Sequence, residues 1–264
     1  MSTTIAQQPA TSRPTPSVSS PIRRPSFVRL TRIELRKATD YRAGRWILGV
    51  ILLLSVLAMV WDVIHASDQP IRLMSFVNDA LTPALLLLPV IGILAMTSEW
   101  TQRTALTTFT LSPRRAPVLV AKLVAALVLM LAVVAAVVVL TVGATALAGA
   151  VSGDPVHWAT TWRDWVAQLL PQALYLLMGA GFGALIPITG VALTGFFVAP
   201  TLLTILTETV LKKVGEWVDV FGAFDRISSL HFDGKGAQTI TSVGIWIVLP
   251  LVLGIFLSTR REVK

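Results

Sequence analysis

The sequence lacks the residues and motifs on which several kinds of chemistry depend. It has no cysteine, so it offers no disulfide framework and no thiolate for catalysis or metal binding. It contains no G-x-x-x-x-G-K-[ST] phosphate loop, no H-E-x-x-H zinc motif and no G-x-S-x-G nucleophile motif. Its histidines, His65, His157 and His231, are isolated from one another, which gives no support for a metal site. We therefore predict that the chain is not itself an enzyme and binds no cofactor or metal.

Charged residues are also scarce. They make up only 14% of the 264 residues, whereas 54% are hydrophobic and the mean hydropathy is +0.74; a soluble domain has about 25% charged residues. A helix that crosses the hydrocarbon core of a bilayer needs about 20 mostly apolar residues. Six stretches meet this requirement, at 46–64, 80–98, 116–149, 168–188, 190–210 and 239–258. The sequence therefore predicts an all-α, polytopic membrane protein with six transmembrane helices.

The apolar stretches contain almost no ionisable residues. The few that occur, Asp62, Asp79, Lys122 and Glu208, lie near the ends of the stretches. A carrier driven by protons or ions needs such groups at membrane depth, where they bind and relay the ion. The sequence therefore disfavours a proton-driven carrier, and energy, if the protein uses any, must come from outside the chain.

The charges that are present are distributed unevenly between the two sides of the predicted bundle. With both termini on one side, the segments on that side contain 16 of the 22 Lys and Arg residues but only 4 of the 14 Asp and Glu residues. An excess of Lys and Arg marks the cytoplasmic side of a membrane protein. We therefore predict a plasma-membrane protein with cytoplasmic termini. The net charge of +8 then suits an anionic inner leaflet and not a nucleic acid.

We divide the chain into three parts. Residues 1–25 are rich in Ser, Thr and Pro and have no acidic residue, which predicts a disordered cytoplasmic tail; a transit peptide is the alternative. Residues 26–44 are expected to form an interfacial amphipathic helix, and residues 45–264 the six-helix domain. Within that domain, 98–115 is a cytoplasmic loop. The outer insertion at 211–238 has a mixed composition that suits short surface or re-entrant helices.

The predicted amphipathic helix has one cationic side. At about 100° per residue, Arg29, Arg32 and Arg36 fall within a narrow arc. Glu34 lies among the apolar residues of the opposite side, and Lys37 adds a further positive charge. This pattern is typical of a helix that lies on an anionic membrane surface. The alternative is a basic patch that only determines topology.

The third apolar stretch is longer than one membrane crossing requires. A helix that starts at Pro113, a favourable first position, and ends at Ala150 would be about 57 Å long. The hydrocarbon core is about 30 Å thick. Because Arg114, Arg115 and Lys122 lie on the first three turns, we expect this end of the helix to project into the cytoplasm.

Two prolines, Pro83 and Pro89, interrupt the second apolar stretch. Each removes a backbone donor and can bend the helix. In a membrane the freed carbonyl groups must be satisfied by neighbouring groups, so we expect polar contacts from adjacent helices near these prolines.

Two further patterns within the apolar stretches each have two interpretations. Gly179 and Gly183 have the spacing that lets two helices approach closely, either within one chain or between two copies. The fifth stretch has a polar stripe of Thr194, Thr201, Thr204 and Glu208. These side chains either line a path across the membrane or, for the threonines, bond to the carbonyl groups of their own helix.

The loop between the second and third stretches carries a recognisable pattern. It begins with Glu99, continues with Arg103 and Thr104, and then has a turn rich in Thr and Leu. The Pro-x-Arg of Pro113 and Arg115 follows, and Lys122 lies at the start of the next stretch. The pattern resembles that of the membrane subunits (permeases) of ABC-2 type transporters, actinobacterial members in particular, with Arg103 in place of a family Gly. The segment from Glu34 to Lys37 resembles the interfacial helix of this family. The resemblance covers residues 26–264.

The resemblance implies a mechanism. Two permease copies, identical or closely related, would pair and sit on two separate ATPase subunits, which would bind ATP and Mg²⁺. The loop, with Glu99, Arg103, Thr104, Pro113, Arg114, Arg115 and Lys122, would couple to the ATPase, and the interfacial helix would lie beside it. Members of the family mostly export lipids, polysaccharides, drugs or peptides. The alternatives are an ATP-independent channel or facilitator, and a non-transporting membrane assembly or anchoring protein.

Overall fold

The computed structural model describes residues 26–68, 70–101, 115–209 and 212–260. Its regular elements are helices: α1 (Phe27–Asp40), α2 (Arg42–Ile64), the 3-10 turn η1 (Ala66–Asp68), α3 (Leu73–Thr101), α5 (Arg115–Ser152), α6 (Trp162–Leu185), α7 (Thr189–Thr209), α8 (Lys212–Val218), α9 (Val220–Ser229), α10 (Gly236–Val243), the π-helical η2 (Gly244–Val248) and α11 (Leu249–Arg260). Six helical segments of this part of the chain are long and apolar enough to cross a membrane. The prediction of a six-helix, all-α membrane protein is confirmed. The predicted tail, residues 1–25, lies outside the described residues.

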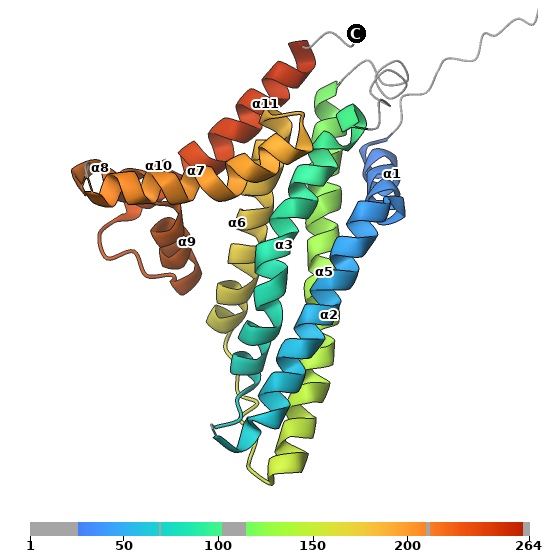
Figure 1. Ribbon diagram of the computed structural model, residues 1–264, viewed down its shortest axis with the longest axis vertical. Coiled ribbons are helices and arrows are strands. Elements are labelled where there is room, and N and C mark those ends of the chain that lie inside the picture. Colours follow the sequence, from blue (N-terminus) through green and yellow to red (C-terminus); the bar gives the residue numbers. More distant parts are fainter. Residues whose placement is uncertain (1–25, 69, 102–114, 210–211, 261–264) are drawn as a thin grey trace, which may run out of the picture.

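Four of the long helices, α2, α3, α5 and α6, lie side by side along the long axis of the molecule (Figure 1). The helix α1, the end of α3, the start of α5 and the end of α11 share the upper end in Figure 1, which we call the inner end. The loops between α2 and α3 and between α5 and α6 lie at the opposite, outer end. The two ends of the helical part of the chain are therefore on one side, and its assignment to the cytoplasm stays a prediction.

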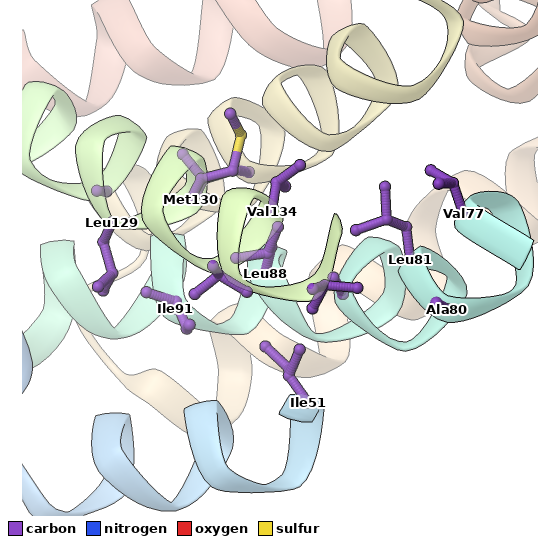
Figure 2. Close-up of a cluster of buried hydrophobic side chains, with 14 of the residues drawn as sticks. Ile51, Val77, Ala80, Leu81, Leu88, Ile91, Leu129, Met130 and Val134 are labelled. Atoms are coloured by element: carbon purple, nitrogen blue, oxygen red, sulfur yellow. The ribbon is translucent and has the colours of Figure 1, made fainter. Parts of the chain in front are cut away.

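The main core lies between α2, α3 and α5. Figure 2 shows Ile51 of α2 facing Leu88 and Ile91 of α3, with Met130 and Val134 of α5 in the same cluster; all five side chains are buried. Between helices in lipid, close packing replaces the hydrophobic effect as the main source of attraction. This cluster therefore holds the first three apolar helices together.

The helices α3 and α6 approach closely through glycines. A Cβ on Gly183 would lie 2.7 Å from the carbonyl oxygen of Ile93, and one on Gly179 would overlap the carbonyl oxygen of Pro89. Gly92 of α3 has the same relation to α6, because its Cβ would lie 2.5 Å from the carbonyl oxygen of Leu176. The close approach predicted for Gly179 and Gly183 thus occurs within one chain.

Side chains from two neighbouring helices bond to α3 beside Pro83. The hydroxyl of Ser55 in α2 donates to the carbonyl oxygen of Ala80 at 2.7 Å, and Nε2 of Gln172 in α6 donates to that of Leu81 at 3.1 Å. Pro83 has no backbone N–H and cannot donate to the carbonyl of Asp79, four residues earlier. The carbonyls of Ala80 and Leu81 are the next two along the chain. Adjacent helices thus bond to the two carbonyls that follow the freed one, and a partner for the freed carbonyl itself stays a prediction.

The third apolar helix, α5, has 38 residues, which corresponds to about 57 Å. It runs along the whole length of the bundle (Figure 1). The prediction of an overlong third helix is confirmed. Its expected start at Ser112 and Pro113 lies outside the described residues.

The C-terminal part of the chain is less regular. In Figure 1, α7 runs across the long axis and away from α2 and α5, although its length and composition suit a membrane span. The last apolar segment changes from α10 to the π-helical η2 and then to α11. Pro250 cannot donate to the carbonyl of Trp246, and such a gap favours a local change of helix register.

The insertion at 211–238 packs against the side of α6. The ring of Phe224 in α9 meets that of Tyr175, near the middle of α6, edge to face at 4.8 Å between centroids. The indole nitrogen of Trp246 donates to the carbonyl of Val218, in α8, at 2.7 Å. In Figure 1, α9 lies beside α6 and away from the outer end of the bundle, and the choice between surface and re-entrant helices stays a prediction.

Candidate functional site

A buried ion pair joins α1 to α5 at the inner end. Nζ of Lys122 in α5 lies 2.6 Å from Oε2 of Glu34 in α1, and Nζ of Lys37 lies 2.8 Å from Oε1 of the same carboxylate. Glu34 is 6% exposed and Lys122 is 3% exposed. Glu34 thus contacts two lysines, one on its own helix and one 88 residues away.

The helix α1 is placed against α5 by its capping and by the corner that follows. Ser26 caps the start, its hydroxyl accepting a bond from the backbone N–H of Arg29 at 3.3 Å. Only Tyr41 separates α1 from α2. At this corner Gly44 is needed, because a Cβ there would lie 2.7 Å from the carbonyl oxygen of Ala38. The sequence therefore folds α1 back onto the bundle and turns Glu34 toward Lys122.

The surroundings of the pair are apolar. Val118, Leu119, Ala121 and Ala125, the neighbours of Lys122 within one turn of α5, are buried. An isolated ammonium or carboxylate in such surroundings is strongly unfavourable, and mutual attraction offsets only part of the cost of removing both from water. The two charges are stable here because they are paired, and losing either one would remove a close opposite charge from the other, which stays buried.

The opposite face of α1 is cationic and exposed. Arg29, Arg32 and Arg36 are exposed, whereas Leu35 and Ala38 pack against the main core. The amphipathic pattern predicted for residues 26–44 is therefore present. Part of its apolar side packs on the same chain, whereas Phe27 and Val28 are exposed, and the location of α1 at a membrane surface stays a prediction.

The predicted coupling residues fall at this same end of the molecule. Glu99 belongs to the last turn of α3 and Arg115 begins α5, but their side chains lie outside the described part of the structure. Arg103, Thr104, Pro113 and Arg114 lie outside the described residues. Lys122 is described and buried, so any part it has in coupling would act through contacts within this chain, such as the one with Glu34.

A second polar contact at the inner end joins α3 to the start of α7. Oγ1 of Thr189 donates to Oγ1 of Thr97 at 2.8 Å, and Thr97 donates to the carbonyl of Ile93 at 3.0 Å. Thr97 is fully buried. Sequence reasoning did not single out this pair, since a threonine near the end of an apolar helix is common and its partner is 92 residues away.

The threonine stripe of α7 makes local bonds. Thr194, Thr201 and Thr204 each donate to the carbonyl oxygen four residues earlier, at 3.0 Å in every case. Thr194 and Thr201 are exposed on α7. Their hydroxyl protons are therefore already engaged, as one of the two interpretations expects. The side chain of Glu208 lies outside the described part, and a role of this stripe in lining a path stays a prediction.

The three histidines lie apart from the ion pair. His65 stacks on Trp61 at 4.1 Å, the backbone of His157 bonds to the α2–α3 loop through Ile71 and Leu73, and His231 faces Asp233 at 2.9 Å. Within the described ranges, no three His, Asp or Glu side chains come together in a way that could hold a metal ion.

The sequence matches no protein-family model, and no match to a curated protein was found. What is established is therefore the architecture, a polytopic membrane protein with six candidate spans.

Proposed function

We propose that this protein is the membrane subunit of an ABC-2 type exporter. It would form the translocation path together with a second copy, identical or closely related, and would be driven by a separate ATPase subunit that holds ATP and Mg²⁺. The chain itself would catalyse no reaction. The proposal uses the resemblance in the loop after α3 and the arrangement of the inner end of the molecule.

The buried contact between Glu34 and Lys122 is the observation that carries the proposal. It fastens α1, an amphipathic helix with an exposed arginine face, to α5 close to the point where the cationic interval 102–114 enters α5. A partner bound to this interval would push on a helix of about 57 Å that reaches the outer end. A rigid helix of this length can carry a displacement from one side of a membrane to the other.

The arginine face of α1 supports the same proposal. Arg29, Arg32 and Arg36 are exposed on α1, which lies at the inner end (Figure 1). Cationic side chains in this position attract the anionic lipids of an inner leaflet, at about 1 kcal/mol for each residue near the surface. We propose that these lipids hold α1 level with the membrane surface, beside the ATPase.

The proposal is tested by purifying the tagged full-length chain from membranes that also contain a candidate ATPase, chosen as a protein with a phosphate-loop motif from a neighbouring reading frame. We expect a stable complex whose ATP hydrolysis depends on both proteins. The variant Arg103→Glu/Arg115→Glu reverses one charge of the cationic interval and the charge at the first residue of α5, and it should weaken the complex. Arg163→Glu, at the outer end, is the matched control and should leave it unchanged.

Three outcomes would favour other functions. Substrate movement in vesicles that contain only this chain, without nucleotide, would identify a channel or facilitator. Failure to move any substrate, with loss of localisation in the loop variants, would identify an anchoring or assembly protein. A complex that forms equally well with the double Glu variant would contradict coupling through this interval.

A further inference from the structure

We propose that Glu34 and Lys122 form a mechanical joint that makes α1 and the inner part of α5 move as one unit. The two residues are positioning residues, since neither is expected to touch a substrate or nucleotide. The proposed function supplies only the origin of the force, and the joint itself is a property of this chain alone.

The position of the joint determines which helices would share a displacement. Lys122 lies seven residues after Arg115, where α5 begins, which corresponds to about 10 Å along the helix. Glu34 lies seven residues before Tyr41, after which α2 begins. A displacement at the start of α5 would therefore pass through the joint into α1 and across the Gly44 corner into α2. Without the joint, it would reach those helices through the apolar packing of α5 against α1 and α2.

An ion pair suits this task better than apolar contacts do. Apolar side chains can slide past one another with little change in buried area, because their attraction has no preferred direction. Here both oxygens of Glu34 are bonded, to Lys122 at 2.6 Å and to Lys37 at 2.8 Å. Sliding α1 along α5 would separate a buried carboxylate from a buried ammonium group, which is strongly unfavourable. The pair therefore holds the two helices in one register.

The burial of the pair is itself informative. A buried ion pair can often be replaced by apolar residues of similar volume with no loss of stability, so stability alone does not explain its presence. The chain offers an exposed pair for comparison, Lys235 and Glu216, at 2.9 Å and with side chains 41% and 51% exposed. Such an exposed pair has little influence on the position of a helix.

The first test measures amide hydrogen exchange of the purified full-length protein in lipid nanodiscs. In Glu34→Gln we expect the α1 amides to exchange about tenfold faster than in the wild type, because Lys122 loses a charged partner. Glu216→Gln is the matched control and should leave α1 unchanged. Equal exchange of α1 in Glu34→Gln and the wild type would overturn the proposal.

The second test separates a joint from a merely stabilising contact. The variant Glu34→Leu/Lys122→Met keeps the volume and removes both charges, and it should unfold at the wild-type temperature or above. Spin labels are attached through Arg32→Cys on α1 and Val151→Cys near the outer end of α5, both exposed positions in a chain with no other cysteine. The distance distribution between them should be narrow with the ion pair present and should broaden and shift in the apolar variant.

An unchanged distance distribution between the spin labels in Glu34→Leu/Lys122→Met would overturn the proposal of a joint, whichever partner the protein has. Neither test contains an ATPase, so both can succeed even where the purification of an ATPase complex fails. In that case the joint stands and the proposed exporter function is rejected. If Glu34→Gln fails to fold, the apolar variant still decides the question.

Discussion

Gly183 of α6 lies so close to Ile93 of α3 that a Cβ on Gly183 would be 2.7 Å from the carbonyl oxygen of Ile93. Gly179, one turn earlier, has the same relation to Pro89. Backbone meets backbone at both positions, so no flexible side chain can move aside. The two glycines therefore set the distance between α3 and α6, and each can be tested by adding one methyl group.

Gly183→Ala should destabilise the protein by about 1–3 kcal/mol, because the added carbon forces α3 and α6 apart. The measurement is thermal unfolding in detergent. Gly143→Ala in α5 is the control, since a Cβ there has open space around it. Alanine is the better helix former, so the control should be neutral or stabilising by up to about 1 kcal/mol. Equal effects at the two positions would contradict the close α3–α6 contact.

Lys122→Met should cost about 3–5 kcal/mol of folding free energy, because it leaves the buried Glu34 carboxylate without this partner. Glu216→Gln, in the exposed pair with Lys235, should cost no more than about 1 kcal/mol. Urea titration of the purified protein gives both values. A cost for Lys122→Met as small as that for Glu216→Gln would mean that the pair is not buried.

Ser55→Ala should cost about 1 kcal/mol, since it removes the donor to the carbonyl of Ala80 beside the bend at Pro83. Thr82→Ala is the control. The Thr82 hydroxyl is exposed and bonds only within its own helix, to the carbonyl of Asn78. We expect the control to be near neutral in the same unfolding assay. A neutral Ser55→Ala would show that the carbonyls near Pro83 need no donor from α2.

Trp246→Phe should cost about 1 kcal/mol and should loosen the insertion, because the indole nitrogen donates to the carbonyl of Val218. Limited proteolysis of the 211–238 segment reports this loosening. Trp158→Phe, at an exposed position in the outer loop, should leave the cleavage rate unchanged. Cleavage at the wild-type rate in Trp246→Phe would show that the bond from Trp246 in η2 does not stabilise the insertion.

Much of the architecture could be predicted from the sequence because membrane helices follow from local composition. The six apolar helices, the amphipathic α1 and the 38-residue α5 needed only runs of apolar residues and a periodic pattern. The direction of α7 could not be predicted in this way. Tilt depends on packing against neighbouring helices, which a single apolar run does not specify.

The ion pair could not be predicted as a pair, although both partners were out of place. Glu34 stood on the apolar side of α1, and Lys122 interrupted an otherwise charge-free stretch. Each misfit taken alone was ambiguous, and they are 88 residues apart. Their opposite charges were the available signal, since a charge on an apolar face needs a partner of opposite sign. The Thr97–Thr189 contact left no comparable signal.

The central claim is that the interval between α3 and α5 faces the cytoplasm and receives the ATPase. The most direct measurement labels Thr107→Cys, the single cysteine in an otherwise cysteine-free chain, with a membrane-impermeant maleimide. We predict no labelling in intact cells, full labelling after the membrane is opened, and protection when the ATPase is bound. Labelling of intact cells would place this interval outside and would contradict the account.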